Sequence, residues 1–127
     1  MILVDSDVLI AHLRGVDAAR QWLMRARTET GPLAISTIGI AEVAGGMRSP
    51  ERREVARLLA SLRRVPVTER IAWRAAEFMR AHHRSNVGIG LGDYLVAATA
   101  HVEGLDLATL NTTHFPMFGG LAAPFDL

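Results

Sequence analysis

Three acidic residues of this chain stand where unpaired carboxylates are unusual. Asp5 follows the apolar run that opens the chain, Glu42 lies among small and apolar residues, and Asp93 begins a long apolar segment. A carboxylate that is buried without a partner is costly, so it shifts its pKa or acquires a compensating group. A metal ion is the economical partner. Because the chain has no cysteine, oxygen-only ligands are expected, and these favour a hard cation such as Mg²⁺ or Mn²⁺.

Each acid also has a purely structural explanation. Asp5 could cap the N-terminus of a helix, and Asp93 could compensate the positive end of a helix dipole. Glu42 could simply be exposed, although its apolar neighbours leave little polar face on that helix. The joint occurrence of the three acids favours the metal site.

A cation held by two or three carboxylates suits phosphodiester hydrolysis. That reaction needs a nucleophilic water and neutralisation of the developing negative charge, and a bound cation provides both. Asp93 or Asp5 would orient the water. Arginines such as Arg14, Arg48 and Arg84 could hold a nucleic-acid backbone, since a guanidinium pairs bidentately with phosphate.

The opening residues predict a central strand that ends at the site of chemistry. Residues 2–4 form an apolar, β-branched-rich run that meets acid at Asp5 and Asp7. This pattern is typical of a buried strand of a parallel sheet. Open α/β sheets bind their ligands at the carboxyl ends of the strands, so we expect the chemistry at Asp5.

The remaining apolar pattern alternates between strands and helices. Strands are expected at 2–4, 33–35, 65–67 and 106–109, with a fifth at 122–125, and helices at about 6–13, 17–30, 39–47, 50–62, 68–84 and 93–103. Pro66 places the third strand at an edge, and the helix at 93–103 is apolar nearly all round, as a helix buried between layers is. The fold class is therefore α/β, with a short central parallel sheet flanked by helices on both faces.

Composition bounds the class of protein. The chain has 127 residues, of which 50% are apolar, so we expect one domain over 1–127. The absence of cysteine excludes disulfides and fits a reducing cytoplasm. The start lacks a signal-peptide pattern, and the longest uncharged run, 107–125, is interrupted by proline and glycine, so no membrane helix is expected. All 14 basic residues are arginines between Arg14 and Arg84, which leaves the last third acidic.

Four segments, taken together, resemble the motifs of PIN-domain nucleases. They are the strand followed by Asp-Ser-Asp-Val-Leu-Ile at the start, Ile-Ser-Thr-Ile-Gly-Ile-Ala-Glu at 35–42, Gly-Asp-Tyr-Leu-Val-Ala-Ala-Thr-Ala at 92–100, and Leu-Ala-Thr-Leu-Asn-Thr-Thr-His-Phe at 107–115. Their order, their spacing and the total length resemble the VapC toxins of bacterial toxin–antitoxin modules. The similarity spans essentially the whole chain.

The resemblance implies a function and partners. It implies a Mg²⁺- or Mn²⁺-dependent endoribonuclease, with Asp5, Glu42 and Asp93 as the acidic site and with 3′-hydroxyl and 5′-phosphate products. It also implies a toxin that a cognate VapB-like antitoxin neutralises, a homodimer, and a cytoplasmic location without membrane association.

The resemblance also assigns supporting positions. Asp7 stands where such domains carry a further, more variable polar residue, and Ser6 and Thr109 match small hydroxyl positions. In the fourth motif many PIN domains have an acid, whereas this chain offers Thr109, Asn111 and His114. Asn111 could coordinate through its amide oxygen but adds no charge, so one tight metal and a weak second are expected.

Two alternatives compete with this interpretation. Phosphatases of the haloacid dehalogenase type also begin with a strand followed by Asp-x-Asp, a pattern that Asp5-Ser6-Asp7 satisfies. The chain, however, has no lysine to neutralise a phospho-aspartate, and 127 residues is short for that class. The other alternative is a non-catalytic PIN-fold module that only binds RNA or protein, against which the retained acids argue.

Two weaker patterns are interpreted structurally. The glycines at 88, 90 and 92 lack the lysine of a P-loop and the spacing of a dinucleotide fingerprint, so a loop is expected there. His101 and His114 lack metal-ligand spacing and are expected to be structural or at the surface.

Overall fold

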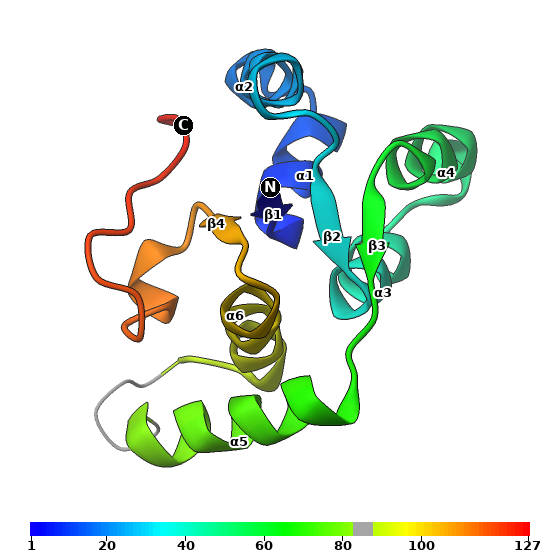
Figure 1. The fold of residues 1–127 in the computed structure, drawn as a ribbon. Helices are drawn as coiled ribbons and strands as arrows, with labels where there is room; N and C mark the ends of the chain where they lie inside the picture. Colours follow the sequence, from blue (N-terminus) through cyan, green and yellow to red (C-terminus); the bar gives the residue numbers. More distant parts are fainter. Residues whose placement is uncertain (83–87) are drawn as a thin grey trace.

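The computed structural model describes residues 1–82 and 88–127, in which a parallel sheet is covered by helices (Figure 1). Its strands are β1 (Ile2–Val4), β2 (Ala34–Ser36), β3 (Arg63–Val65) and β4 (Asp106–Ala108). The helices are α1 (Ser6–Leu13), α2 (Asp17–Thr30), α3 (Thr37–Gly45), α4 (Arg52–Ala60), α5 (Glu69–His82) and α6 (Leu91–Glu103), with short 3₁₀ turns η1 (Ser49–Glu51) and η2 (Thr112–His114).

β1 lies inside the sheet, as its apolar run predicted. The strand order is β3-β2-β1-β4, and every pair is parallel. Leu3 is in register with Ala34 of β2 and with Leu107 of β4. Because parallel strands end at the same edge, the segments that follow β1, β2 and β4 come together there.

The side-chain alternation of the strands explains the layers on the two faces. Val4 and Ile35 belong to a core cluster that includes residues of α1, α2, α3 and α4. Their neighbours Leu3 and Ala34 point to the other face, into a cluster with α6. The predicted α/β architecture, with helices on both faces of a central parallel sheet, is confirmed.

α6 is buried between the sheet and α5. Val96 and Ala97 pack in the cluster that contains the sheet residues, whereas Tyr94 and Ala98 pack against Ile71 of α5. This two-sided packing explains why the helix is apolar nearly all round. No helix in the described ranges has the length and hydropathy needed to cross a membrane.

β3 occupies an edge, as predicted, but starts earlier than expected. It covers Arg63–Val65 rather than 65–67, and the N–H of Arg63 donates to the carbonyl of Leu33 at 2.8 Å. Pro66 has no N–H to offer a sheet, so it follows the strand instead of lying in it.

Other boundaries move by smaller amounts. β2 is displaced by one residue from the expected 33–35, β4 ends before Thr109, and α3 ends at Gly45 rather than near 47. The expected end of α5 near Arg84 lies outside the described residues.

The fifth strand expected at 122–125 is wrong. Those residues form no strand, and the ring of Phe125 lies 6.5 Å from that of Trp22 on α2. Pro124 removes a backbone donor, so side-chain packing on α2 takes the place of strand pairing.

Candidate active site at the carboxyl edge of the sheet

Asp5 lies directly after β1 and is only 6% exposed. Its Oδ1 accepts the N–H of Ser6 at 2.8 Å, which caps α1, and its Oδ2 accepts the hydroxyl of Thr109 at 2.8 Å. Burial, followed by the charge of Asp7, raises the pKa of Asp5 from 3.8 to about 7, although both hydrogen bonds oppose the shift. Asp5 is therefore a helix cap and also a carboxylate held at an energetic cost.

Glu42 projects from α3 toward the same edge. The hydroxyl of Ser6 donates to its Oε1 at 3.2 Å. Glu42 is exposed at the rim, yet the surrounding protein still shields it enough to raise its pKa, and the charges of Asp93 and Asp7 raise it further. Ser6 thus joins Asp5 to Glu42, one through its backbone and the other through its hydroxyl.

Asp93 approaches from the first turn of α6. Its Oδ2 accepts the N–H of Gly90 at 3.0 Å and lies 3.2 Å from Nδ1 of His114. A Cβ atom at Gly92 would lie 3.0 Å from Oε2 of Glu42. The missing side chain at Gly92 therefore lets α6 approach Glu42 closely, which brings the second and third acids together.

Asp7 holds the loop that follows β4. Its Oδ2 accepts the N–H groups of Leu110 and Asn111, both at 3.0 Å, and lies 3.2 Å from the Thr109 hydroxyl. Burial raises the pKa of Asp7, and these hydrogen bonds oppose the rise. Asp7 Oδ1 is buried without a partner among the described residues. Because a hydroxyl has one proton, Thr109 cannot donate fully to both Asp5 and Asp7.

The supporting residues take different parts. Ser6 and Thr109 touch the acids through their hydroxyls, as the small-hydroxyl interpretation expected. Asn111 reaches the cluster through its backbone N–H, and its amide makes no described contact with the acids. Coordination by that amide stays a prediction.

The donor set fits a hard cation. Three chain segments bring oxygen ligands together. Burial, and after it the like charges, raises the pKa of Asp5 and of Glu42, and one buried oxygen of Asp7 has no partner among the described residues. Within 1–82 and 88–127, however, no three acidic or histidine side chains form a ready metal-binding group. A cation with few direct protein ligands and several waters suits such an open arrangement, and Mg²⁺ has that preference.

Two of the arginines expected to hold a nucleic-acid backbone are bound to a carboxylate instead. Arg14 Nη1 lies 2.8 Å from Oε2 of Glu51, and Arg48 Nε lies 3.2 Å from Oε1. The hydrogen bonds from Arg48 are the main cause that lowers the pKa of Glu51 to about 2. The third arginine, Arg84, lies outside the described residues.

The sequence analysis missed two residues of the site. His114 was expected at the surface or in a structural role, yet it contacts Asp93. Gly92 was expected in a loop, yet it lies in α6 against Glu42. For His114 a signal was present in the sequence, because it belongs to the fourth motif at 107–115.

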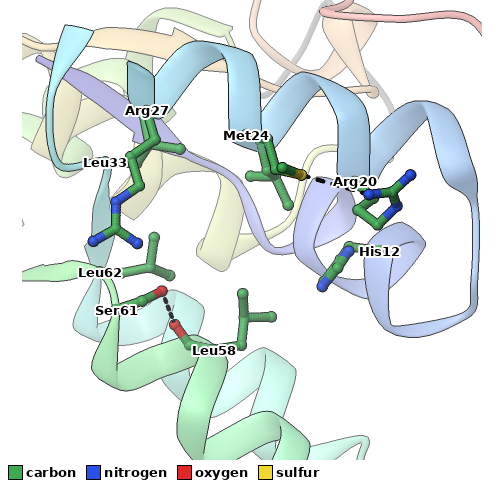
Figure 2. A pocket seen from close by; sticks show the side chains of 9 residues that line it. His12, Arg20, Met24, Arg27, Leu33, Leu58, Ser61 and Leu62 are labelled. Atoms are coloured by element: carbon green, nitrogen blue, oxygen red, sulfur yellow. Dashed lines mark hydrogen bonds between the residues drawn. The ribbon is translucent and has the colours of Figure 1, made fainter. Parts of the chain in front are cut away.

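A groove of about 170 Å³ between α1, α2 and α4 is separate from the acids (Figure 2). It is lined by His12, Arg20, Leu23, Met24, Arg27, Leu33, Leu58, Ser61 and Leu62. Its lining holds no carboxylate, and Met24 is 60% exposed beside it. The groove is thus mainly apolar and is not a second acidic site.

The chain matches a known protein family and curated relatives. A family model described as PIN domain matches residues 2–117. Ribonuclease VapC10 of Mycobacterium tuberculosis is 66% identical over 125 residues, covering 98% of this chain and 93% of that protein. Ribonuclease VapC19 of the same species is 35% identical over 98% of this chain and 100% of its own length.

Solved structures give the same result. A toxin–antitoxin complex from Klebsiella pneumoniae matches with a TM-score of 0.82 and 26% identity, covering 100% of both chains. FitAcB from Neisseria gonorrhoeae matches with a TM-score of 0.75 and 25% identity over 91% of each chain. With a family model covering most of the chain and a curated relative 66% identical, this chain belongs to the VapC family of PIN-domain proteins.

Proposed function

We propose that this chain is a metal-dependent endoribonuclease that hydrolyses RNA phosphodiester bonds as the toxin of a toxin–antitoxin pair. The names of its relatives, ribonucleases VapC10 and VapC19, support the activity. The observation that carries the proposal is the convergence of Asp5, Glu42 and Asp93, from three separate elements, at the carboxyl edge of the sheet.

Asp5, Glu42 and Asp93 would hold the cation, which we take to be Mg²⁺ or Mn²⁺. When bound, the cation would neutralise charge on the phosphate and make a water nucleophilic at neutral pH. The protein prepares its acids for this role. Ser6 and Thr109 fix both oxygens of Asp5, and the Ser6 hydroxyl fixes one oxygen of Glu42. Such preorganisation reduces the rearrangement needed during the reaction.

Asp7 would act on the loop and not on the phosphate. Its hydrogen bonds to Leu110 and Asn111 hold the fourth motif beside Asp5. Asn111 could add a neutral oxygen ligand, which would support one tight and one weak metal.

The same acids would be the target of the antitoxin. The matched structure from Klebsiella pneumoniae is a toxin–antitoxin complex, and we propose a VapB-like antitoxin for this chain. A cationic side chain would stabilise a cluster of carboxylates that repel one another, as a metal ion would. We expect an Arg or Lys of the antitoxin tail among Asp5, Glu42 and Asp93, a homodimeric toxin, and a cytoplasmic site of action.

Two assays test the proposal. Metal-free protein should cleave RNA once Mg²⁺ or Mn²⁺ is added, and a chelator should stop the cleavage. Ca²⁺ should not restore it, because the coordination geometry of Ca²⁺ is looser. Asp5→Asn and Glu42→Gln should be inactive, whereas Asp106→Asn, at the opposite end of the sheet, should match the parent. Undiminished cleavage in excess chelator by a nuclease-free preparation would reject the metal mechanism.

The same experiment separates the alternatives. Because the chain belongs to the VapC family, the alternative of a haloacid-dehalogenase-type phosphatase is set aside. A folded parent that binds RNA but leaves it intact with every metal would support the non-catalytic module.

A further inference from the structure

Both described contacts of the Asp93 carboxylate fall on one of its oxygens. The N–H of Gly90 donates to Oδ2 at 3.0 Å, and Nδ1 of His114 lies 3.2 Å from the same atom. The two side chains of the pair are 23% and 33% exposed, so the contact is partly shielded from water. Among the described residues, no hydrogen bond or ion pair falls on Oδ1.

The short segment that carries His114 is tied down at both ends. At one end the carboxylate of Asp7 accepts the N–H groups of Leu110 and Asn111. At the other end Phe115 is fully buried in the core cluster beneath α6. The backbone that carries His114 is therefore held in place beside Asp93.

We propose that His114 is a positioning residue for Asp93, which holds Oδ2 so that Oδ1 stays available to the catalytic cation. The inference rests on the proposed metal-dependent function. Nδ1 of His114 lies at ion-pair distance from Oδ2, and an imidazole that carries a proton on Nδ1 attracts that oxygen. Residues that orient a metal-binding group typically change metal affinity or activity by about 10–100-fold when they are removed.

The test compares two substitutions of His114 with a neighbouring control. His114→Ala removes the donor, and His114→Asn supplies an amide N–H₂ near the position of Nδ1. Thr113→Ala changes an exposed residue of the same turn. For each protein, freed of metal, the melting temperature is measured as a function of Mn²⁺ concentration. This readout reports binding without requiring cleavage.

We expect the Mn²⁺ concentration that gives a fixed rise in melting temperature to increase about 10–100-fold in His114→Ala. It should stay within about 3-fold of the parent in His114→Asn and be unchanged in Thr113→Ala. RNA cleavage by His114→Ala should be weak at low Mn²⁺ and recover as Mn²⁺ saturates. If His114 served folding alone, His114→Ala would instead have a lower melting temperature in chelator, and the Mn²⁺ concentration that gives the fixed rise would equal that of the parent.

Two results overturn the inference. In the first, His114→Ala needs the same Mn²⁺ concentration as the parent for the fixed rise in melting temperature. In the second, His114→Asn has the melting temperature of the parent in chelator but needs as much Mn²⁺ as His114→Ala for the fixed rise. A parent that fails to respond to Mn²⁺ would overturn the proposed function together with this inference, whereas a responsive parent with unaffected variants would overturn the inference alone.

Discussion

Replacing Asp5 with asparagine should stabilise the metal-free protein at neutral and alkaline pH while abolishing RNA cleavage. Burial is the main cause that raises the pKa of Asp5 from 3.8 to about 7 in the folded protein. In the unfolded chain the same group titrates near its ordinary value. Between these two pKa values the unfolded state releases its proton and the folded state keeps it, so stability falls as pH rises.

The size of the effect follows from the shift. One pKa unit corresponds to about 1.4 kcal/mol, so a shift of roughly three units removes about 4 kcal/mol of folding free energy by pH 8. Asparagine carries no charge and avoids this loss. It gives up one hydrogen bond, because an amide nitrogen cannot accept the Thr109 hydroxyl, at a cost of about 1 kcal/mol. Asp5→Asn should therefore be about 2–3 kcal/mol more stable than the parent at pH 8, and less than about 1 kcal/mol more stable at pH 5.

Urea unfolding in excess chelator, at pH 5 and at pH 8, measures these differences. Asp106→Asn is the matched control, because it removes an exposed acid at the other end of the sheet. The control should leave both the stability and its pH dependence close to those of the parent. If Asp5→Asn is less stable than the parent at pH 8, or if both proteins lose stability equally between pH 5 and pH 8, then Asp5 is an ordinary charged helix cap and the reasoning fails.

Three further predictions concern other residues. Asp93→Asn should be inactive, yet without metal it should be at least as stable as the parent, because the substitution removes repulsion with Glu42. Added Mg²⁺ should raise the melting temperature of the variant much less than that of the parent, and equal rises would show that Asp93 is no ligand. Thr109→Val keeps the shape but leaves a buried oxygen of Asp5 without its donor, so urea unfolding in chelator should show a loss of about 1–3 kcal/mol, and an unchanged midpoint would contradict this. Glu51→Gln should lower the melting temperature at pH 7 yet retain cleavage. The loss should fade as pH falls from the ordinary Glu pKa of 4.5 toward about 2, because the lowered pKa of Glu51 contributes its full stability only above the ordinary value and none below the folded one; a pH-independent difference would argue against the ion pairs with Arg48 and Arg14.

Local sequence patterns were enough to predict a candidate acidic site. The apolar run of β1 ends at Asp5, and the helix that carries Asp93 is apolar nearly all round. Period-two alternation and helical periodicity depend on neighbouring residues, so they can be recognised without knowing the path of the chain. Parallel strands then require their carboxyl ends to share one edge, which explains why Asp5 and Glu42 could be expected together.

Only the tertiary structure decided how the acids are held. Asp5 and Thr109 share a hydrogen bond although they are separated by 104 positions, and His114 faces Asp93 from a different motif. The same dependence on distant partners placed β3 at Arg63–Val65, where its backbone pairs with β2, and placed Phe125 against Trp22 of α2 where a fifth strand was expected. Propensity describes what a segment can form by itself, whereas strand ends, hydrogen-bond partners and the raised pKa of Asp5 depend on which distant groups surround it after folding.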